Sequence, residues 1–593
     1  MKSSLSGNWN AGFHNLSGKT TDSILVTVSL LLSTFLVVPG LFDTTLTSRL
    51  AVYPLSAVIM LLAGRRSVPR WAALGGAALF SIPLLGTIWA PVPLQSVLPS
   101  VRWISFGLML AGAAGVVRRT GARSVWIPLL AVSAAAAVVE IAIPGDLPWG
   151  NPNRPGILLA AGFLISVTGA ASRRAMIRLP AAVLTGTALL LTGFIAAMAA
   201  AAIGALWYLI TLRKSFHPGF LLLVLLTGQV IIIGLPGIAE RVAPTLELRC
   251  RIWKAGSVQL TENIPLGTGT GQSRLTLMQD AGERAQSLAG DPDRRIDHLH
   301  SDVLTPVVEW GVAGLLLLFM AGLRIAGRRF SPGEGAILVC VWIILAVDLP
   351  LATPLGALPA ALCLGAVLTG REPEKHVRIP LPITIMLLVP ALVWGIFIIM
   401  GYRLLERGRT AALSGAVPPG ETAEIFREST SLIPFEERSR LFMTRAYMDA
   451  GNWEEALLSA ETFNSIYPGY WRGWVMQAEA QAAAGRPREA SVSYLNALRT
   501  APVTLRYRNV LALNAAAFPP EETDDLVFLA ENIISLSGLP PDAGTETLLV
   551  WYGRIMRVAE SLPPSRSELS RKLNTYIEAI IARSVDPEYY PWE

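Results

Sequence analysis

Long apolar runs alternate with short polar segments over the first two thirds of the chain. A membrane-spanning helix needs about 20 apolar residues. Apolar runs near this length recur from residue 23 to residue 401. The stretch 179–212 is too long for one ordinary span, so we divide it near Gly193. We predict thirteen spans, at residues 23–41, 50–64, 71–90, 100–117, 124–143, 155–171, 179–194, 197–212, 219–238, 306–323, 334–350, 353–369 and 381–401. The pattern therefore predicts an all-α, polytopic membrane helical bundle of about 12–13 spans.

Basic residues mark one set of the short loops between these runs. With the N-terminus inside, the short outer loops carry only Arg49, Arg102 and Arg154. The inner loops carry 17 Lys and Arg, namely Arg65, Arg66, Arg70, Arg118, Arg119, Arg123, Arg173, Arg174, Arg178, Arg213, Lys214, Arg324, Arg328, Arg329, Arg371, Lys375 and Arg378. By the positive-inside rule, the N-terminus is predicted to lie in the cytoplasm.

The spans divide the chain into five predicted segments. A cytoplasmic tail at 1–22 precedes nine spans at 23–238, and a large extracytoplasmic loop at 239–305 precedes four more spans at 306–401. We do not expect the first run to be a cleaved signal peptide, because a polar tail precedes it and no clear small-x-small site follows. An odd number of spans places the region 402–593 outside. Basic residues shortly after the last span favour the opposite side, but large domains often cross regardless of charge.

The C-terminal region has an internal period of 34 residues. The positions that recur at this spacing are Pro434, Pro468 and Pro502, Gly451 and Gly485, Ala446 and Ala480, and Ala456 and Ala490. Small residues where helices cross, with a proline closing each unit, resemble the tetratricopeptide repeat. Stacked helix pairs of this kind leave a concave surface, so we expect this domain to bind a protein partner.

Composition supports the membrane prediction and removes other classes. Hydrophobic residues make up 52% of the chain and charged residues 16%, with a mean hydropathy of +0.48, whereas soluble proteins carry about 25% charged residues. The formal net charge is +6. Because the inner loops account for most of this excess, we predict no nucleic-acid partner. Three cysteines cannot supply a disulfide framework or a zinc site.

The predicted outer loop at 239–305 contains the most informative polar residues. On a helix, Arg249 and Trp253 share a face, whereas Arg251 points elsewhere. A guanidinium beside an indole suits a phosphate next to a sugar, on which the ring could stack. The alternative is an amphipathic helix with both residues at the lipid headgroups. The glycines at 267–271 predict a tight turn or, alternatively, a backbone nest for an anion.

The two histidines of this loop are candidates for proton transfer. His298 and His300 are the only closely spaced pair in the chain, and imidazole titrates near neutral pH. With Asp302 they could supply three metal ligands, but the spacing matches no familiar motif, so we predict no metal and no cofactor. If a helix starts near Asp302, Asp302 and Glu309 lie seven residues apart on one of its faces, and a carboxylate near His300 could orient its ring. The alternative is an exposed loop histidine without a role.

Acidic residues in the spans gather at the predicted outer face. Glu140, Glu309 and Asp348 all lie at the outer end of a span, and ionisable residues at membrane depth are functional candidates. The alternative is that they are simply hydrated at the interface.

In the proline-rich stretch 148–156, Asn153 and Arg154 could cap a helix and offer donors to an anion. The alternative is a proline turn.

These residues resemble the O-antigen ligase and polymerase family of bacterial membrane glycosyltransferases. In that family a large outer loop carries an Arg four residues before a Trp, as Arg249 precedes Trp253 here. A PLxGxGxG stretch follows, which is IPLGTGTGQ at 264–272 here. A His follows, nine residues before a Glu-x-Gly at the start of the next span, as His300 precedes Glu309 and Gly311 here. The order and topology of these motifs are more specific than any one of them.

The resemblance covers about residues 20–370 and has one departure. The asparagine pair at 151–153 also resembles an outer-loop feature of the family, and several members carry C-terminal tetratricopeptide repeats. The family often shows Ser-Arg-Gly after the apolar run near residue 190, and that arginine is thought to help hold the donor phosphates. This chain reads LTGFIAAMAAA there, with no arginine.

The resemblance implies a transfer reaction at the outer face of the bacterial inner membrane. A glycan would move from an undecaprenyl-pyrophosphate carrier to a hydroxyl of a glycan, lipid or protein acceptor, in cell-surface polysaccharide synthesis. Arg249 would hold the pyrophosphate, helped by Arg251 or Arg154, and His300 would accept the proton. Glu309 or Asp302 would orient the ring. The implied site has His300 and Arg249 as catalytic residues and, for substrate binding, Arg251, Trp253, Asn153, Arg154, His298, Asp302 and Glu309.

Two other functions fit the same sequence. A polymerase would join lipid-linked repeat units to one another instead of attaching them to an acceptor. A non-catalytic scaffold or exporter component would recruit polysaccharide machinery through the repeats, and the missing arginine favours this alternative.

Overall fold

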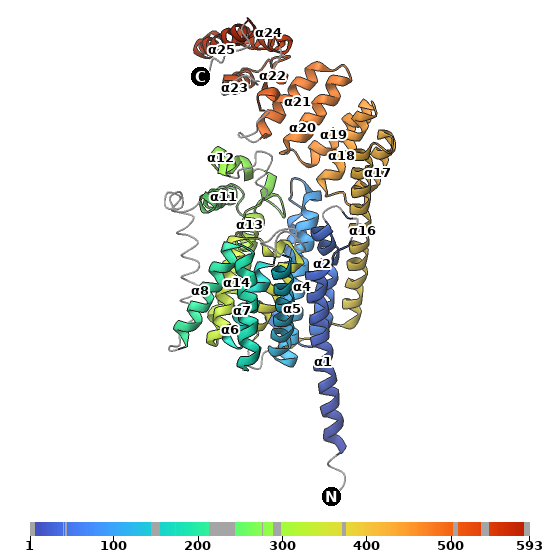
Figure 1. Ribbon diagram of the computed structural model, residues 1–593, viewed down its shortest axis with the longest axis vertical. Helices are drawn as coiled ribbons and strands as arrows, with labels where there is room; N and C mark the ends of the chain where they lie inside the picture. Colours follow the sequence, from blue (N-terminus) through green and yellow to red (C-terminus); the bar gives the residue numbers. More distant parts are fainter. Residues whose placement is uncertain are drawn as a thin grey trace. The chain divides into compact units, whose positions relative to one another are not determined.

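The computed structural model of the chain is built almost entirely of helices (Figure 1). The predicted span at 219–238 and the candidates Asn153 and Arg154 lie outside the residues that it describes. The structure describes residues 6–38, 41, 44–143, 155–171, 174–212, 244–275, 277–288, 298–369, 375–501, 508–534 and 545–585. Two compact units are present, the first comprising residues 1–280, 297–406 and 431–435, and the second residues 281–296, 407–430 and 436–593.

The first unit contains the apolar helices. In chain order they are α1 (Ser6–Phe35), α2 (Thr44–Gly64), α3 (Arg70–Gly86), α4 (Val97–Thr120), α5 (Arg123–Ala142), α6 (Gly156–Thr168), α7 (Ala175–Leu191), α8 (Ile195–Thr211), α11 (Pro244–Glu262), α13 (Leu304–Ala326), α14 (Pro332–Val347), α15 (Pro354–Leu368) and α16 (Leu381–Ser414). Except for α11, each overlaps a predicted span, although α1 begins at Ser6, within the segment predicted as a polar tail. Helices α4, α5, α13 and α16 are long and apolar enough to cross a membrane, and the others are shorter. The chain is an all-α, multi-pass membrane protein.

Short elements connect these helices. They are η1 (Pro93–Ser96), η2 (Ser273–Leu275), η3 (Pro350–Ala352) and α12 (Leu277–Leu288), together with strands β1 (Val68–Pro69) and β2 (His376–Val377), which pair antiparallel. Between α7 and α8 the chain turns at Gly193, where φ is 64°. A left-handed residue favours glycine, so the break falls where the long apolar run is divided in the sequence.

Helices α2 and α4 approach each other through glycines. A Cβ atom added to Gly112 would lie 2.3 Å from the carbonyl oxygen of Met60. One added to Gly115 would lie 2.3 Å from the carbonyl oxygen of Gly64. Helices in lipid gain little from hydrophobic burial against each other, so small residues that allow close backbone contact are a main source of packing energy.

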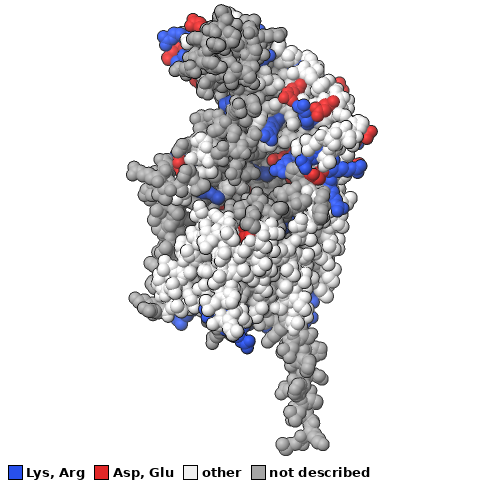
Figure 2. Space-filling model, viewed as in Figure 1, with Lys and Arg blue, Asp and Glu red and all other residues white. Residues whose placement is uncertain are grey.

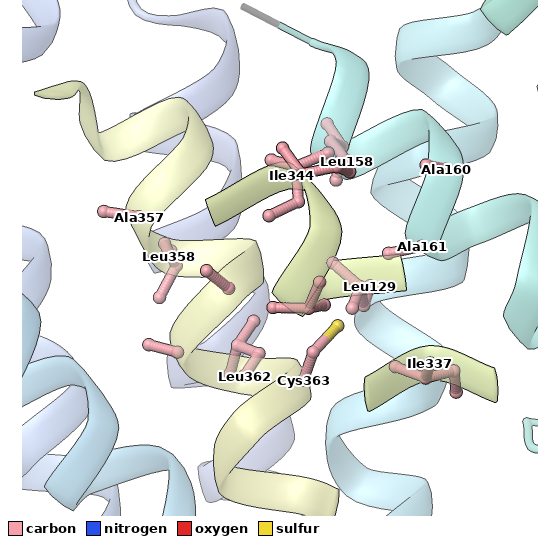
Figure 3. Packing of buried hydrophobic residues seen from close by; sticks show 14 of the residues in the cluster. Leu129, Leu158, Ala160, Ala161, Ile337, Ile344, Ala357, Leu358, Leu362 and Cys363 are labelled. Atoms are coloured by element: carbon pink, nitrogen blue, oxygen red, sulfur yellow. The ribbon is translucent and has the colours of Figure 1, made fainter. Parts of the chain in front are cut away.

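The centre of the first unit is packed by side chains from α5, α6, α14 and α15 (Figure 3). Leu129, Leu158, Ile337, Ile344 and Leu358 meet there, and each is fully or almost fully buried. Figure 2 shows a band with few charged side chains over this unit, with Lys and Arg at its lower edge. The core therefore holds α14 in place, and the end of α14 carries part of the site described below.

The second unit is a series of helix pairs. It contains most of α17 (Pro419–Leu432), then α18 (Glu437–Asp449), α19 (Trp453–Ile466), α20 (Trp471–Ala483), α21 (Pro487–Thr500), α22 (Arg508–Ala515), α23 (Thr523–Ile534), α24 (Thr545–Ser561), η4 (Pro564–Arg566) and α25 (Ser567–Val585). The predicted boundary at residue 402 differs from the observed one, because α16 continues without a break to Ser414 and its contacts change unit after Glu406.

The 34-residue period has a structural counterpart in this unit. Helices α18 and α20 begin 34 positions apart, at Glu437 and Trp471, and α19 and α21 begin at Trp453 and Pro487. A left-handed glycine, Gly451 or Gly485, closes the first helix of each pair. Assignment of these pairs to the tetratricopeptide family stays a prediction, and Pro502 lies outside the described residues.

Replacing Gly112 with Ala tests the glycine contact between α2 and α4. The added methyl group has no room, and overpacking of this kind costs about 1–3 kcal/mol, so G112A should lower the apparent Tm in detergent. The matched control is G75A in α3, where a Cβ atom meets nothing within 4 Å. Alanine is the better helix former by about 1 kcal/mol, so G75A should leave Tm unchanged or raise it. Equal shifts in the two variants would contradict the packing.

Candidate active site

Helix α11 places Arg249 and Trp253 on one face, as the i, i+4 spacing predicts. Arg249 Nη1 donates to the carbonyl oxygen of Val347 at 2.9 Å and, more weakly, to that of His300 at 3.4 Å. Trp253 Nε1 donates to the carbonyl oxygen of Leu299 at 3.0 Å. Both side chains therefore hold the segment that contains His300.

Trp253 is placed differently from the sequence expectation. Its side chain is buried, with the residue 2% exposed, so no ring face is open for a sugar in this structure. The expected stacking role is therefore replaced by a positioning role for the segment around Leu299. The other expectation, that Arg251 points elsewhere, is met, because Arg251 Nε pairs with Glu247 Oε1 at 2.9 Å on the same helix.

His300, Arg249 and Asp348 form a triangle of charged and titratable groups. His300 Nδ1 lies 3.7 Å from Asp348 Oδ1, and Arg249 Nη1 lies 3.8 Å from the same oxygen. The side chains of His300 and Asp348 are each 19% exposed, so the triangle is reachable from outside. Asp348 directly follows α14, and this helix end brings its carboxylate to a histidine 48 positions earlier in the chain. At 3.7 Å the two atoms are too far apart for a hydrogen bond, but close enough to attract each other once the imidazole is protonated.

The backbone of His300 is unusual. Its φ is 50°, the left-handed region that non-glycine residues rarely adopt. Such a conformation costs of order 1–3 kcal/mol and persists only when the surroundings impose it. Here the carbonyl groups of Leu299 and His300 are both hydrogen-bonded to α11, and these bonds fix the strained turn. The ring of His298 lies against that of His300, edge to face, with 3.8 Å between centroids.

Burial keeps His300 uncharged. Loss of solvent lowers the pKa of His300 to about 4, and the carboxylate of Asp348 opposes this by raising the pKa. The neighbouring His298 and Arg249 lower it further. At neutral pH the imidazole is therefore unprotonated and can accept a proton.

The two carboxyl groups expected to orient His300 have other partners. Asp302 accepts from the backbone N–H of Leu351 at 2.8 Å, and burial raises its pKa. Glu309 accepts from Ser273 Oγ at 3.1 Å and from the backbone N–H of Gly271. In this structure the carboxylate beside the ring of His300 is that of Asp348, and not that of Glu309 or Asp302.

The reason is local geometry. Asp302 precedes α13 instead of lying on it, so the two acids do not share a helix face. Glu309 is only 4% exposed and serves the turn that follows α11. Asp348, an acid noticed at the outer end of its span but given no role in the sequence-based site, holds the position beside His300.

The glycine-rich stretch after α11 is a packed turn. Gly267, Gly269 and Gly271 all have positive φ, between 72° and 94°. The backbone N–H of Gly269 donates to the carbonyl oxygen of Glu309 at 2.9 Å, and that of Gly267 to Asn263 at 2.9 Å. Because internal oxygens use these donors, the stretch fits the tight-turn alternative and offers little to an external anion.

Arg102 and Arg274 are two further cations that the sequence-based site lacks. Within the described part of the chain, Arg102 Nε is buried without a hydrogen-bond partner. Arg274, Asp302 and Tyr53 lie within its electrostatic reach. Arg274 Nε donates to Gln95 Oε1 at 2.7 Å. The available signal was that Arg102 is an arginine at the outer end of the span predicted at 100–117.

A chain of hydrogen bonds links Tyr53, which lies within electrostatic reach of Arg102, to the triangle. Tyr53 donates its hydroxyl to the carbonyl oxygen of Leu351 at 2.8 Å, and the N–H of Leu351 donates to Asp302. The backbone N–H of Asp302 donates in turn to the carbonyl oxygen of Asp348 at 3.2 Å. One end of the first unit thus places Arg249 beside a neutral histidine, with the buried Arg102 within electrostatic reach of Asp302, an arrangement that suits an acid-base reaction on an anionic substrate.

The arrangement is that of a multi-pass membrane protein with a polar site at the end of its helices. Residues 180–319 match the family model for O-antigen ligase, a stretch that includes Arg249, Trp253, His300 and Glu309. No curated protein matches the chain. The family match supports an enzyme of the O-antigen ligase and polymerase type, a membrane glycosyltransferase that acts on lipid-linked glycans.

The protonation of His300 can be measured directly. Proton-carbon NMR of the protein with ring-labelled histidine should give His300 a pKa near 4, with the resonance assigned from H300Q. In D348N the pKa should fall further, because the carboxylate raises it in the native protein. Exposed His376 is the internal reference. A native His300 pKa near 6.5, unmoved by D348N, would contradict the described environment.

Proposed function

We propose that the protein transfers a glycan from an undecaprenyl-pyrophosphate carrier to an acceptor hydroxyl, as an O-antigen ligase does. The triangle of Arg249, Asp348 and His300 is the observation that carries the proposal. It combines a neutral base, a carboxylate to stabilise that base once protonated, and a fixed cation. The carrier pyrophosphate is already a good leaving group. Catalysis therefore needs only a base for the acceptor hydroxyl, a carboxylate beside that base, and a cation for the departing anion.

In the proposed reaction, His300 acts as the base and Asp348 stabilises its protonated form. The ring nitrogen of His300 that faces away from Asp348, Nε2, accepts the proton of the acceptor hydroxyl. The acceptor oxygen then forms a bond to the anomeric carbon of the glycan. The bond from that carbon to the phosphate oxygen breaks, and its electron pair leaves with the carrier pyrophosphate. Asp348 stabilises the imidazolium that results, as the carboxylate does in a hydrolase triad.

Positive charge stabilises the departing pyrophosphate. Arg249 is fixed by two backbone carbonyl groups, so little reorganisation is needed when negative charge develops nearby. Arg251 is engaged by Glu247 and is a weaker candidate than the sequence implied. We assign the second cationic role to Arg102 and Arg274 instead, which would replace the arginine of the absent Ser-Arg-Gly motif. His298 would contribute by packing against the ring of His300.

The cellular setting follows from the same proposal. The site would lie at the outer face of the bacterial inner membrane, where lipid-linked glycans are used, with a glycan, lipid or protein as acceptor. The helix pairs of the second unit would recruit that acceptor or a partner protein. No metal or nucleotide is needed, since the energy resides in the lipid-linked bond.

Substitutions in the triangle should abolish transfer without loss of protein. General-base catalysis contributes about 10²–10⁴-fold, so H300A should reduce product by about that factor, and R249A should be comparably defective. The matched controls are H376A and R123A, which remove an exposed histidine and an exposed arginine outside the site. Product is read as surface glycan on gels from cells that lack the native protein. Full activity of both triangle variants would exclude this site.

Deletion of the protein in its native host separates the related functions. A ligase predicts that complete, carrier-linked chains accumulate unattached. A polymerase predicts the loss of long chains, with single repeat units remaining. Unchanged glycans in the deletion strain, or normal glycans with the H300A variant, would favour the non-catalytic scaffold.

A further inference from the structure

Two short loops at the opposite end of the first unit are joined by backbone hydrogen bonds. β1 pairs with β2, in the register Val68 with Val377. The N–H of Ile379 donates to the carbonyl oxygen of Arg65 at 2.8 Å, and that of Arg70 to Lys375 at 3.0 Å. These bonds fix the end of α2 against the start of α16.

A pocket lies at this junction. It has a volume of about 500 Å³, and its lining residues are Arg65, Arg66, Arg378, Ile379, Pro380 and Leu381. Helix α16 begins here at Leu381 and reaches Tyr402, which lies within electrostatic reach of Arg102. The pocket is therefore separated from the candidate active site by the length of the apolar part of α16.

The charged residues that line the pocket are all basic. Three of its lining residues are arginines and none is acidic. In the described part of the chain, Arg65, Arg66 and Arg378 make no ion pair, and Arg65 Nε is buried without a partner. Three guanidinium groups around one cavity repel each other, so an anion bound among them would relieve this repulsion.

The positive-inside rule accounts for the presence of these arginines but not for their convergence. Other arginines of the predicted inner loops, such as Arg123 and Arg329, do not line this pocket. Arg65 and Arg378 are over three hundred positions apart, and a dedicated pair of strands brings them together. Rigid placement of like charges is a feature of binding sites for phosphate groups.

The surface next to the pocket is apolar. Helix α16 exposes Leu381, Ile385, Met386 and Val389 along its first half, each at 43% or more. Only 17% of its apolar segment is buried inside the protein, which leaves the rest to lipid. A ligand with a phosphate group in the pocket could therefore lay acyl chains along this helix.

We propose that this pocket binds the headgroup of an anionic phospholipid whose acyl chains lie along α16. Basic pockets between membrane helices are suited to such headgroups. The bound lipid would neutralise the arginines and hold the loops that carry β1 and β2 together. This site is separate from the triangle and does not depend on the glycan-transfer proposal.

Lipid retention by the purified protein tests the proposal. Native mass spectrometry in detergent should show phosphatidylglycerol binding in preference to phosphatidylcholine. The variant R65Q/R378Q should bind phosphatidylglycerol about 30-fold more weakly, because two charges are removed from the pocket. The matched control R123Q/R329Q removes two charges elsewhere and should bind as the native protein does. R378Q alone, at an exposed position, serves if the double variant does not fold, and should bind less than R123Q.

Three outcomes would overturn the proposal. Equal affinity of the protein for phosphatidylglycerol and phosphatidylcholine would show that headgroup charge does not determine binding. Equal weakening in R65Q/R378Q and R123Q/R329Q would show that the pocket arginines are not specifically required. Displacement of the lipid by millimolar inorganic phosphate would assign the pocket to a free anion. None of these measurements involves glycan transfer, so their failure leaves the proposed function untouched.

Discussion

The candidate active site depends on the hydrogen bonds that Arg249 makes to the end of α14 and to the segment around His300. Arg249 donates to the carbonyl oxygens of Val347 and His300 and faces the carboxylate of Asp348. A partly buried guanidinium is stable only when its donors and its charge are satisfied. Satisfying Arg249 in this way brings α11, the His300 segment and α14 to one point. The strained backbone and the neutral ring of His300 both follow from that convergence.

The core explains why this point is rigid. Helix α14 is buried along most of its length against α6, α8 and α15. This packing fixes the position of its end, which Asp348 follows directly. The turn at 267–271 is also tightly packed, because a Cβ atom added to Gly267 or Gly271 would clash with neighbouring atoms. Pre-organised groups of this kind need little movement when charge develops, and that is the main source of catalytic power in such sites. The same unit carries an arginine pocket at its far end, where structure and charge are equally fixed.

Much of this could be predicted from the sequence, and the exceptions have physical reasons. Apolar runs predicted the membrane helices because a bilayer requires about 20 apolar residues per span. The i, i+4 rule placed Arg249 and Trp253 correctly, because it concerns one helix. The position of Asp348 beside His300 depends on how two distant segments pack, which no local pattern encodes. The pairing of Asp302 with Glu309 failed because the helix begins at Leu304, after Asp302.

The pH dependence of transfer by the reconstituted protein tests the central claim most directly. The donor is an undecaprenyl-pyrophosphate-linked glycan, and the measured quantity is kcat/KM between pH 4 and 8. A base whose pKa burial has lowered to about 4 is active when unprotonated, so transfer should persist at pH 5.5 and fall only as pH approaches 4. An acid limb centred near pH 6.5, unchanged in D348N, would contradict a buried histidine base held beside Asp348.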